Sequence, residues 1–262
     1  MNLARLRRIP KRLKDDLKIY RLAENWRELW FAKLDDGSLH RIRLRNGVVL
    51  NAPGAVSLNF LFHEIWLDEF YAPDGYEIRP NETVVDIGAN VGVFAMWAAT
   101  RAPNVKVLSF EPFPANAEYF RANQKASGLD NVEFKAAAVG GSDGKRTLYV
   151  SDSWMLHSLA DGASSSEEGL EVDCVSLDTA LSGIEKCDLL KIDCEGGEYE
   201  VLYTASPGTI RKIGRIVCEF DVLDNTERNG DGLRNFLSGN GFRVDQLRLL
   251  DGSTGFICAA RI

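Results

Sequence analysis

Residues 83–94, TVVDIGANVGVF, constrain the fold more than any other part of the chain. The first of them are mostly β-branched, which is typical of a strand that is covered on both faces. Gly88, Asn90 and Gly92 then follow at alternate positions before an apolar segment. Glycines at such a turn let a ligand approach the backbone, and the next helix begins with free N–H groups. The pattern predicts a strand, a glycine-rich turn and a helix over residues 91–101 around a nucleotide-type cofactor.

The acidic residue that ends this strand separates two classes of cofactor. Dinucleotide-binding turns read G-x-G-x-x-G, whereas this chain reads D-x-G-x-N-x-G from Asp86 to Gly92. A carboxylate there suits a ligand with an amino group and a sulfonium cation, and it would repel a pyrophosphate. The turn therefore favours S-adenosylmethionine. An NAD-dependent oxidoreductase is the alternative, because it shares the strand, the turn and a ribose-binding acid.

Acidic residues also end the later apolar runs. The second run, VKVLSF, ends in Glu111, and the fourth, CDLLKI, runs into Asp193. We expect a third strand over residues 131–139, where the small side chains of Ala137 and Ala138 leave room for a flat ring. Ligands of open parallel sheets bind at the carboxyl ends of the strands. The sequence therefore predicts an α/β fold with its site at that edge.

Three motifs together resemble the FkbM-type methyltransferases, a family within the S-adenosylmethionine-dependent class. They are VVDIGANVGVFA at residues 84–95, LSFEPFP at 108–114 and LLKIDCEGGEYEVL at 189–202. The combination is specific, although each motif alone is not. The resemblance implies a doubly wound, mostly parallel seven-stranded sheet of the Rossmann-like class I methyltransferases. Asp221 departs from the family pattern, because a histidine often stands there, two places after the glutamate of the fifth strand.

This architecture gives the strand ends separate roles in holding the cofactor. One group is expected to hold the methionine portion, and it consists of Asp86, Gly88, Asn90 and Gly92. Glu111 would bind the ribose, and Pro112 and Phe113 would pack against the adenine near Ala138. A purely structural turn is the alternative role for the glycines.

Asp193 is the residue that we expect beside the reacting centre, because the end of the fourth strand lies across from the methyl donor. It would orient the cofactor's amino group, or act as a general base if burial raises its pKa. Glu195 is a second catalytic candidate, with helix capping as its alternative role. His157 would be a base carried by a loop over residues 151–169, or a solvated loop residue. No dense D-x-D pattern supports a metal site.

The motif at the end of the fourth strand and the charge of the chain limit the class of molecule that could accept the methyl group. The fourth strand ends in DCEGGE and not in an N-P-P-Y segment, so methylation of amino groups on nucleic-acid bases is disfavoured. Residues 51–262 carry 18 Lys and Arg against 32 Asp and Glu, which argues against a nucleic-acid partner. The family resemblance implies a hydroxyl of a sugar, glycan or secondary metabolite as acceptor.

Residues 1–80 are predicted to form an extension that precedes a methyltransferase domain over residues 81–262. Leu and Trp recur at helical spacing over residues 11–33, so we expect one amphipathic helix that packs on the domain. The alternative is that this helix makes weak contact with a membrane surface. A third function that the sequence leaves open is a catalytically silent module that docks on a glycan assembly. A hairpin is expected over residues 39–50 and a helix over 60–70.

Two later segments and the cysteines complete the predictions. Residues 140–150 are expected to form an inserted hairpin before the loop, and residues 241–246 and 255–262 the last two strands, the final one antiparallel. The five cysteines include no C-x-x-C pair, and the basic start has no long apolar run after it. These features favour a reducing, cytoplasmic compartment, and the oligomeric state is left open.

Overall fold

A seven-stranded sheet forms the centre of the protein, in the order β12-β13-β11-β10-β3-β4-β5. The computed structural model describes residues 11–32, 38–53, 58–150, 157–158 and 169–262, to which all structural statements refer. The strands are β3 (Thr83–Ile87), β4 (Lys106–Phe110), β5 (Val132–Lys135), β10 (Cys187–Ile192), β11 (Ile213–Asp221), β12 (Phe242–Leu249) and β13 (Thr254–Arg261). Only β13 runs antiparallel to its neighbours. The predicted fold class is confirmed.

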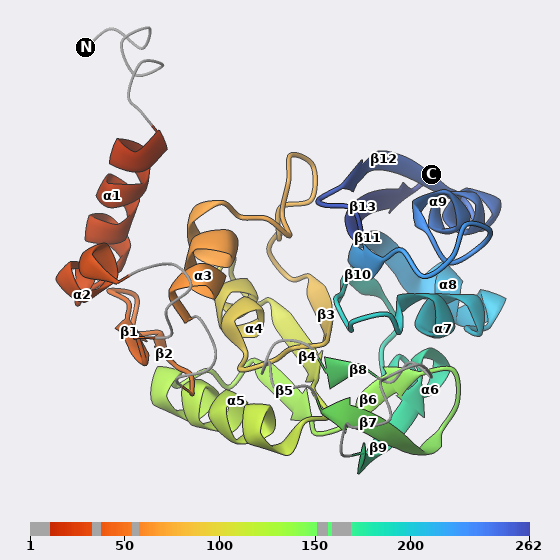
Figure 1. Ribbon diagram of the computed structural model, residues 1–262, viewed down its shortest axis with the longest axis horizontal. Helices are drawn as coiled ribbons and strands as arrows, with labels where there is room; N and C mark the ends of the chain where they lie inside the picture. The colour runs from red at the N-terminus through yellow and green to blue at the C-terminus, as the bar shows by residue number, and fades with distance from the viewer. Residues whose placement is uncertain (1–10, 33–37, 54–57, 151–156, 159–168) are drawn as a thin grey trace, which may run out of the picture.

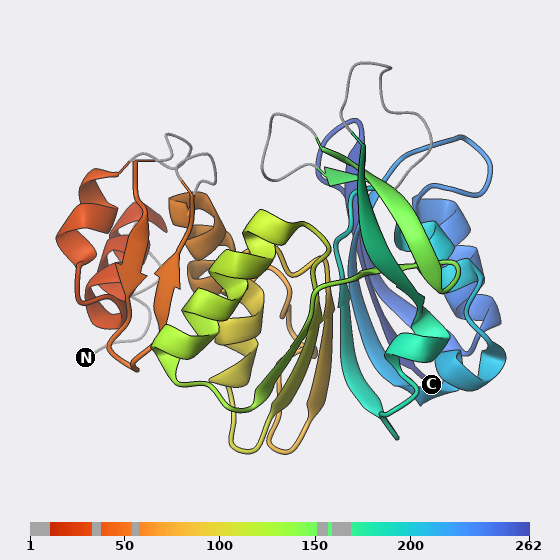
Figure 2. The same ribbon diagram turned by 90° about the horizontal axis from the view of Figure 1, so that it is seen from below.

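Helices cover both faces of this sheet, as Figure 2 shows. Those on one face are α4 (Val93–Ala99) and α5 (Pro114–Ser127), and those on the other are α7 (Glu198–Tyr203), α8 (Pro207–Lys212) and α9 (Gly230–Gly239). Side chains alternate along each strand, so β3 sends Val84 into the core beside α4 and Val85 and Ile87 into the opposite core. Burial on both faces explains the nearly continuous apolar strands.

A separate four-stranded sheet is inserted between β5 and β10, in the order β6-β9-β7-β8. Its strands are β6 (Ala138–Gly140), β7 (Gly144–Val150), β8 (His157–Ser158) and β9 (Gly169–Ser176), and the short helix α6 (Leu177–Ala180) follows. The prediction of one strand over residues 131–139 was wrong, because β5 and β6 belong to different sheets. The hairpin predicted over residues 140–150 was also wrong, because β7 pairs with β9. Most of the loop predicted over residues 151–169 lies outside the described residues.

Short helices and a small hairpin make up the described N-terminal part of the chain (Figure 1). Its elements are α1 (Lys11–Leu22), α2 (Trp26–Phe31), β1 (Arg41–Arg43), β2 (Val49–Asn51), α3 (Leu58–Phe62) and the π-helix η2 (His63–Leu67). The single helix predicted over residues 11–33 is therefore broken in two. The Asn25 side chain explains the break, because it accepts the N–H of Arg43 and donates to the carbonyl of Arg41, both at 2.9 Å. These bonds tie the chain to β1.

The exposed side of α1 is more apolar than predicted. Ile19 is buried, but Leu13, Leu17 and Tyr20 are each about half exposed. The prediction that this helix packs its apolar face on the domain is therefore only partly right. No helix in the described part of the chain has the length and apolarity of a membrane span.

The hairpin is anchored to the rest of the protein through a pair of amides. Asn123 of α5 accepts the N–H of Asn51 at 2.7 Å and donates to the carbonyls of Asn51 and Val91, at 2.9 and 2.8 Å. Ile42 and Leu50 belong to the same core cluster as Val84. The extension therefore shares its core with the sheet, and the division at residue 80 stays a prediction.

Candidate active site

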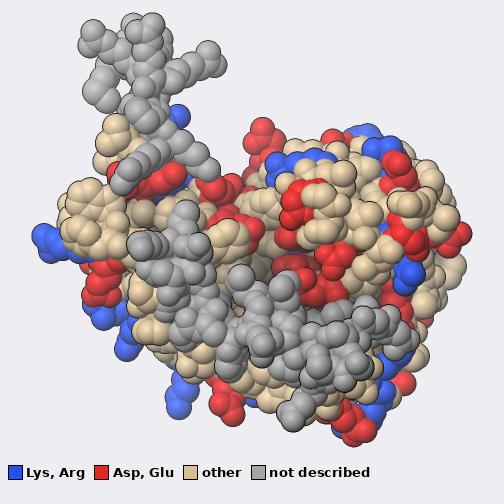
Figure 3. Space-filling view, in the orientation of Figure 1, with Lys and Arg blue, Asp and Glu red and all other residues tan. Residues whose placement is uncertain are grey.

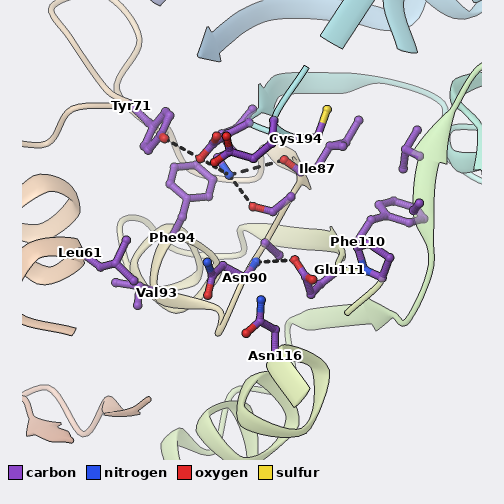
Figure 4. A pocket seen from close by; sticks show the side chains of 18 of the residues that line it. Leu61, Tyr71, Ile87, Asn90, Val93, Phe94, Phe110, Glu111, Asn116 and Cys194 are labelled. Atoms are coloured by element: carbon purple, nitrogen blue, oxygen red, sulfur yellow. Dashed lines mark hydrogen bonds and ion pairs between the residues drawn. The ribbon is translucent and has the colours of Figure 1, made fainter. Parts of the chain in front are cut away.

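A pocket lies at the carboxyl ends of β3, β4 and β10, the edge that the sequence predicts. Figure 3 shows acidic side chains gathered around a hollow on this face, and Figure 4 shows the pocket from close by. The described residues that line it are Leu61, Glu64, Ile65, Tyr71, Ile87, Gly88, Ala89, Asn90, Val93, Phe94, Phe110, Glu111, Pro112, Asn116, Ala137, Ala138, Val139, Leu148, Lys191, Asp193, Cys194 and Glu195. Residues from distant parts of the chain therefore converge on one pocket.

The glycine turn brings the ends of β3 and β10 into contact. Gly88 has a φ of +76°, and a Cβ there would lie 1.7 Å from the carbonyl oxygen of Asp193. Gly92 does not line the pocket; its φ is +89°, and a Cβ would lie 2.8 Å from the ring of Phe120. Both positions thus require glycine for structural reasons. A direct contact of Gly92 with the cofactor stays a prediction.

Glu111 is fixed at one end of the pocket by two backbone groups. Its carboxylate oxygens accept the N–H groups of Asn90 and Phe113, each at 2.9 Å. Burial raises its pKa to about 7, although these hydrogen bonds favour the ionised form. Nearby, Oδ1 of the buried Asn116 has no hydrogen-bond partner among the described residues. This end of the pocket therefore offers oxygen acceptors to the hydroxyl and N–H groups of a ligand.

The wall beside Glu111 is apolar. Pro112, Ala138 and Leu148 line it, and the latter two come from the inserted sheet. Phe113 does not line the pocket; its side chain packs against the small core of that sheet. Pro112 and Ala138 line the pocket, and the packing of Pro112 and Phe113 against an adenine near Ala138 stays a prediction.

The opposite end of the pocket is built from one face of the sheet. Asp86 and Lys191 are register partners on β3 and β10, and Lys191 in turn pairs with Val217 on β11. Because side chains alternate, Asp193 and Glu219, two places further on, continue the same face. That face points to the side of the sheet where Tyr71 and η2 lie, and charged groups gather there.

Lys191 is a buried cation that the sequence analysis missed. Its Nζ lies 2.8 Å from the carbonyl oxygen of Gly88, 3.2 Å from Asp86 and 3.5 Å from Asp193. Burial disfavours the ammonium, but the two carboxylates outweigh this effect and raise the pKa of Lys191. A lone lysine inside the apolar run CDLLKI was the available signal.

Asp86 lies beneath the pocket and does not line it. Its side chain is fully buried, faces Lys191, and accepts a long hydrogen bond of 3.5 Å from Ser109. In this arrangement its charge holds Lys191 against the glycine turn. Direct contact between Asp86 and the methionine portion of a cofactor stays a prediction.

Asp193 lines the pocket, and other polar groups surround it; its place beside the reacting centre stays a prediction. The Tyr71 hydroxyl lies 2.9 Å from Asp193 Oδ2 and 3.2 Å from Glu219 Oε2. Burial, and then the charge of Asp193, raise the pKa of Glu219 to about 8 and that of Glu64 to about 7. The sequence analysis assigned no role to Tyr71 or Glu64, because their aromatic-rich segment also fits a plain core.

The structure describes the side chain of only one of the two other catalytic candidates, Glu195 and His157. Glu195 lines the pocket with a φ of +54°, and burial and Asp193 raise its pKa to about 9. The side chain of Glu198, the first residue of α7, instead accepts the N–H groups of Cys194 and Gly196 in the preceding loop at 3.1 Å, and the Gly197 N-cap has no side-chain capping hydrogen bond. His157 pairs with Val150 through its backbone in β8, but its side chain lies outside the described residues. Its role as a base stays a prediction.

The described residues contain no group of three His, Cys, Asp or Glu side chains arranged to hold a metal ion. The acids beside Asp193 interact with each other and with Lys191. All five cysteines are unpaired, and four of them are buried.

Comparison with known proteins identifies the family. Residues 86–244 match the methyltransferase FkbM domain, and this match spans more than half of the chain. The chain belongs to this family. Membership confirms the predicted FkbM-type resemblance, and it supports S-adenosylmethionine as the cofactor over NAD.

Two curated relatives differ greatly in the share of their own length that this chain covers. The AMB antimetabolite synthetase AmbE of Pseudomonas aeruginosa is 29% identical over 90% of this chain, which spans only 12% of that protein. The 31-O-demethyl-FK506 methyltransferase FkbM of Streptomyces tacrolimicus is 28% identical over 78% of this chain and 88% of its own length. Among solved structures, a precorrin-6y C5,15-methyltransferase from Geobacter metallireducens is 16% identical over 70% of this chain and 82% of its own, with a TM-score of 0.42.

Proposed function

We propose that the protein is an S-adenosylmethionine-dependent O-methyltransferase that acts on a hydroxyl of a sugar, glycan or secondary metabolite. The observation that carries this proposal is one pocket that joins the backbone-anchored Glu111 to the carboxylate of Asp193 across the glycine turn. Glu111 suits the hydroxyls of a ribose, and the acids at the other end suit an ammonium and a sulfonium. Asn116 Oδ1 adds an acceptor that has no hydrogen-bond partner among the described residues.

The protein's own part in the reaction is alignment and proton removal. The cofactor supplies an electrophilic methyl group, and the transfer is an in-line displacement that needs a correctly placed hydroxyl. Asp193 would accept the proton of that hydroxyl, since its side chain is 30% exposed and borders the pocket. Leu61, Ile65 and Phe94 would exclude water from the same end.

The choice of oxygen as acceptor rests on the names of the relatives. The Streptomyces relative is named as a methyltransferase of a demethylated oxygen, and the Pseudomonas relative as a synthetase of an antimetabolite. Both names support an acceptor of the secondary-metabolite class. A sugar or glycan hydroxyl belongs to the same chemistry.

Calorimetry with S-adenosylhomocysteine tests the cofactor. Binding with a dissociation constant in the micromolar range is expected, and a folded protein that gives no heat at high micromolar ligand would remove the proposal. A fluorescence shift of added NADH would instead favour the oxidoreductase. Transfer of a deuterated methyl group to hydroxyl compounds, followed by mass spectrometry, separates an active enzyme from a catalytically silent module that docks on a glycan assembly.

The N-terminal helices suggest where the enzyme works. Leu17, Tyr20 and Trp30 are each about half exposed, and Arg27 and Arg45 lie over the rings of Trp26 and Tyr20. Exposed aromatic and aliphatic side chains flanked by cations suit weak contact with an anionic membrane surface. We place the protein in the cytoplasm, in keeping with its five unpaired cysteines.

A further inference from the structure

Tyr71 lies between two carboxyl groups that come from different strands. Asp193 follows the end of β10, Glu219 is in β11, and the buried Tyr71 follows η2. The hydroxyl oxygen lies 2.9 Å from Asp193 Oδ2 and 3.2 Å from Glu219 Oε2. Figure 4 shows the Tyr71 hydroxyl directed at the acidic end of the pocket.

The number of hydrogens available for these two contacts determines how many protons the two carboxyl groups carry. A tyrosine hydroxyl has one hydrogen to donate, and an ionised carboxylate can only accept. If both carboxyl groups were ionised, one of the two contacts would join two oxygens with no hydrogen between them. One additional proton, on either carboxyl group, completes both hydrogen bonds.

The surroundings indicate which carboxyl group holds this proton. Asp193 has the shorter contact with Tyr71, and Lys191 Nζ lies 3.5 Å from it. Both neighbours favour the ionised form of Asp193. Glu219 has the longer contact, and the charges of Asp193 and Glu64 face it; Lys191 acts on Glu219 in the opposite direction, but more weakly than either acid. Protonation of Glu219 therefore removes more charge repulsion than protonation of Asp193 would.

We propose that Glu219 carries a proton in the resting protein and donates it to Tyr71, whose own hydrogen is donated to Asp193. Glu219 is thus a positioning residue, and Asp193 is the free carboxylate of the site. Burial and Asp193 raise the pKa of Glu219 to about 8, in agreement with this assignment. Burial and the surrounding acids hold the pKa of Tyr71 well above its ordinary value, so Tyr71 keeps its proton.

The hydrogen-bonded unit of Asp193, Tyr71 and Glu219 also returns the site to its resting state after methyl transfer. This step rests on the proposed function. The acceptor O–H bond breaks and its proton moves to Asp193, while the oxygen forms the new C–O bond. S-adenosylmethionine would supply the methyl group and would keep the electron pair of its C–S bond on sulfur. Glu219 then releases its proton to water, and the Tyr71 hydroxyl turns to the resulting carboxylate. Tyr71 passes its hydrogen to Glu219 as Asp193 passes its proton to Tyr71, which restores the neutral Glu219 and the ionised Asp193.

Carboxyl NMR on the full chain labelled with ¹³C in Asp and Glu tests the proposal without any acceptor. The Glu219 signal, assigned by its loss in Glu219→Gln, should be that of a neutral acid at pH 7, with a midpoint of about 8. Ionisation of Glu219 within the ordinary glutamate range, near 4.3, would overturn the proposal.

Two tyrosine variants separate the hydrogen-bonded unit from general electrostatics. Tyr71→Phe should move the midpoint of the Glu219 signal and change the chemical shift of the Asp193 carboxyl carbon. Tyr76→Phe is the matched control, because the buried Tyr76 donates to Asp245 at 3.0 Å, outside the pocket. Its loss should leave both signals in place.

If Tyr71→Phe does not fold, the Asp193 signal in Glu219→Gln decides. The glutamine can still donate to Tyr71, so Asp193 should remain a carboxylate. A protonated Asp193 at neutral pH in this variant would contradict the proposal. Calorimetry with S-adenosylhomocysteine keeps the two questions apart, since a normal carboxyl titration without binding would remove only the cofactor assignment.

Discussion

Asp86 and Lys191 face each other across neighbouring parallel strands, with 3.2 Å between Asp86 Oδ1 and Lys191 Nζ. Their side chains are 0% and 3% exposed. Lys191 also donates to the carbonyl of Gly88 at 2.8 Å, so the pair holds the glycine turn from below. A buried ion pair therefore lies beneath the pocket, and its two residues are more than 100 positions apart in the chain.

Lys191→Met should destabilise the protein strongly. It leaves the buried Asp86 carboxylate without its counter-charge, and breaking a buried pair costs about 3–5 kcal/mol. Urea unfolding followed by circular dichroism measures the loss. Lys186→Met is the control, because Lys186 is 69% exposed and pairs with Asp188 at the surface, where pairs contribute about 0–1 kcal/mol. Equal losses in the two variants would argue against the buried pair as a structural element.

Glu111→Gln should weaken S-adenosylhomocysteine binding by about 1.5–3 kcal/mol, because hydrogen bonds to a charged group are lost. The glutamine keeps the shape of the side chain, which limits disturbance of the turn. Calorimetry measures the affinity. Glu133→Gln, with a side chain that is 64% exposed in β5, should bind as the unchanged protein does. Full affinity in Glu111→Gln would remove Glu111 from the cofactor site.

Gly88→Ala should disrupt the site far more than Gly75→Ala. Both glycines have positive φ values, +76° and +91°, so both substitutions carry the same type of backbone strain. That strain costs about 1 kcal/mol. Only at Gly88 would the new Cβ collide with a neighbour, the carbonyl of Asp193 at 1.7 Å, whereas nothing lies within 4 Å at Gly75. Thermal unfolding and ligand affinity, measured together, should show this difference; similar behaviour would contradict it.

The cofactor-free protein should lose stability as the pH rises from about 5 to about 8. Burial raises the pKa of Glu64, Glu111 and Glu198 from 4.5 to about 7. A carboxyl group with a raised folded-state pKa binds more protons in the folded chain. Its stabilising contribution is complete below the unfolded value and is lost as the pH passes the folded value. Unfolding midpoints in urea across this interval measure the effect.

Carboxyl groups with lowered pKa values do not change the direction of this pH dependence of stability. The pKa of Asp251 is lowered to about 2 by hydrogen bonds, first from the backbone of Ser253, so it stays ionised throughout the interval. Glu111→Gln removes one of the raised groups and should make the pH dependence shallower. A stability that increases over the interval would mean that these carboxyl groups are not protonated in the folded protein.

Leu17→Glu should reduce binding to vesicles that contain anionic lipid, because Leu17 is 49% exposed on α1. The change removes apolar contact and adds a repelled charge. Co-sedimentation with anionic and neutral vesicles measures it. Leu249→Glu is the control, since Leu249 is 63% exposed in β12, far from α1 in Figure 1. If all three proteins pellet alike, the N-terminal helices have no role in membrane contact.

The central sheet could be predicted because its strands carry their own signals. Residues 83–87 and 187–192 are apolar runs that end in acids, and periodicity alone places those acids at one edge. The inserted sheet could not be predicted in the same way. β7 pairs with β9 across a long segment, so its partner is not a neighbour in sequence. The apolar residues at alternate positions of GLEVDCVS were a signal for β9 that the analysis did not use.

The presence of Glu111 and Asp193 at the pocket could be predicted, because each residue follows the end of its own strand. Residues that come to this region through pairing across strands were missed. Lys191 lines the pocket, and Glu219 contacts Tyr71 beside it, because the register of β3, β10 and β11 places them near Asp86 and Asp193. Tyr71 comes from a segment outside the sheet. Such pairings depend on register, which a single sequence does not specify.

The sheet formed by β6 to β9 has a consequence for how this scaffold can change. It is a sheet of its own between β5 and β10, yet Ala138 and Leu148 on it line the pocket. Its length and side chains can be altered without breaking any ladder of the central sheet. Diversification of chemistry in such proteins can therefore proceed by remodelling one insertion while the donor-binding framework is inherited intact.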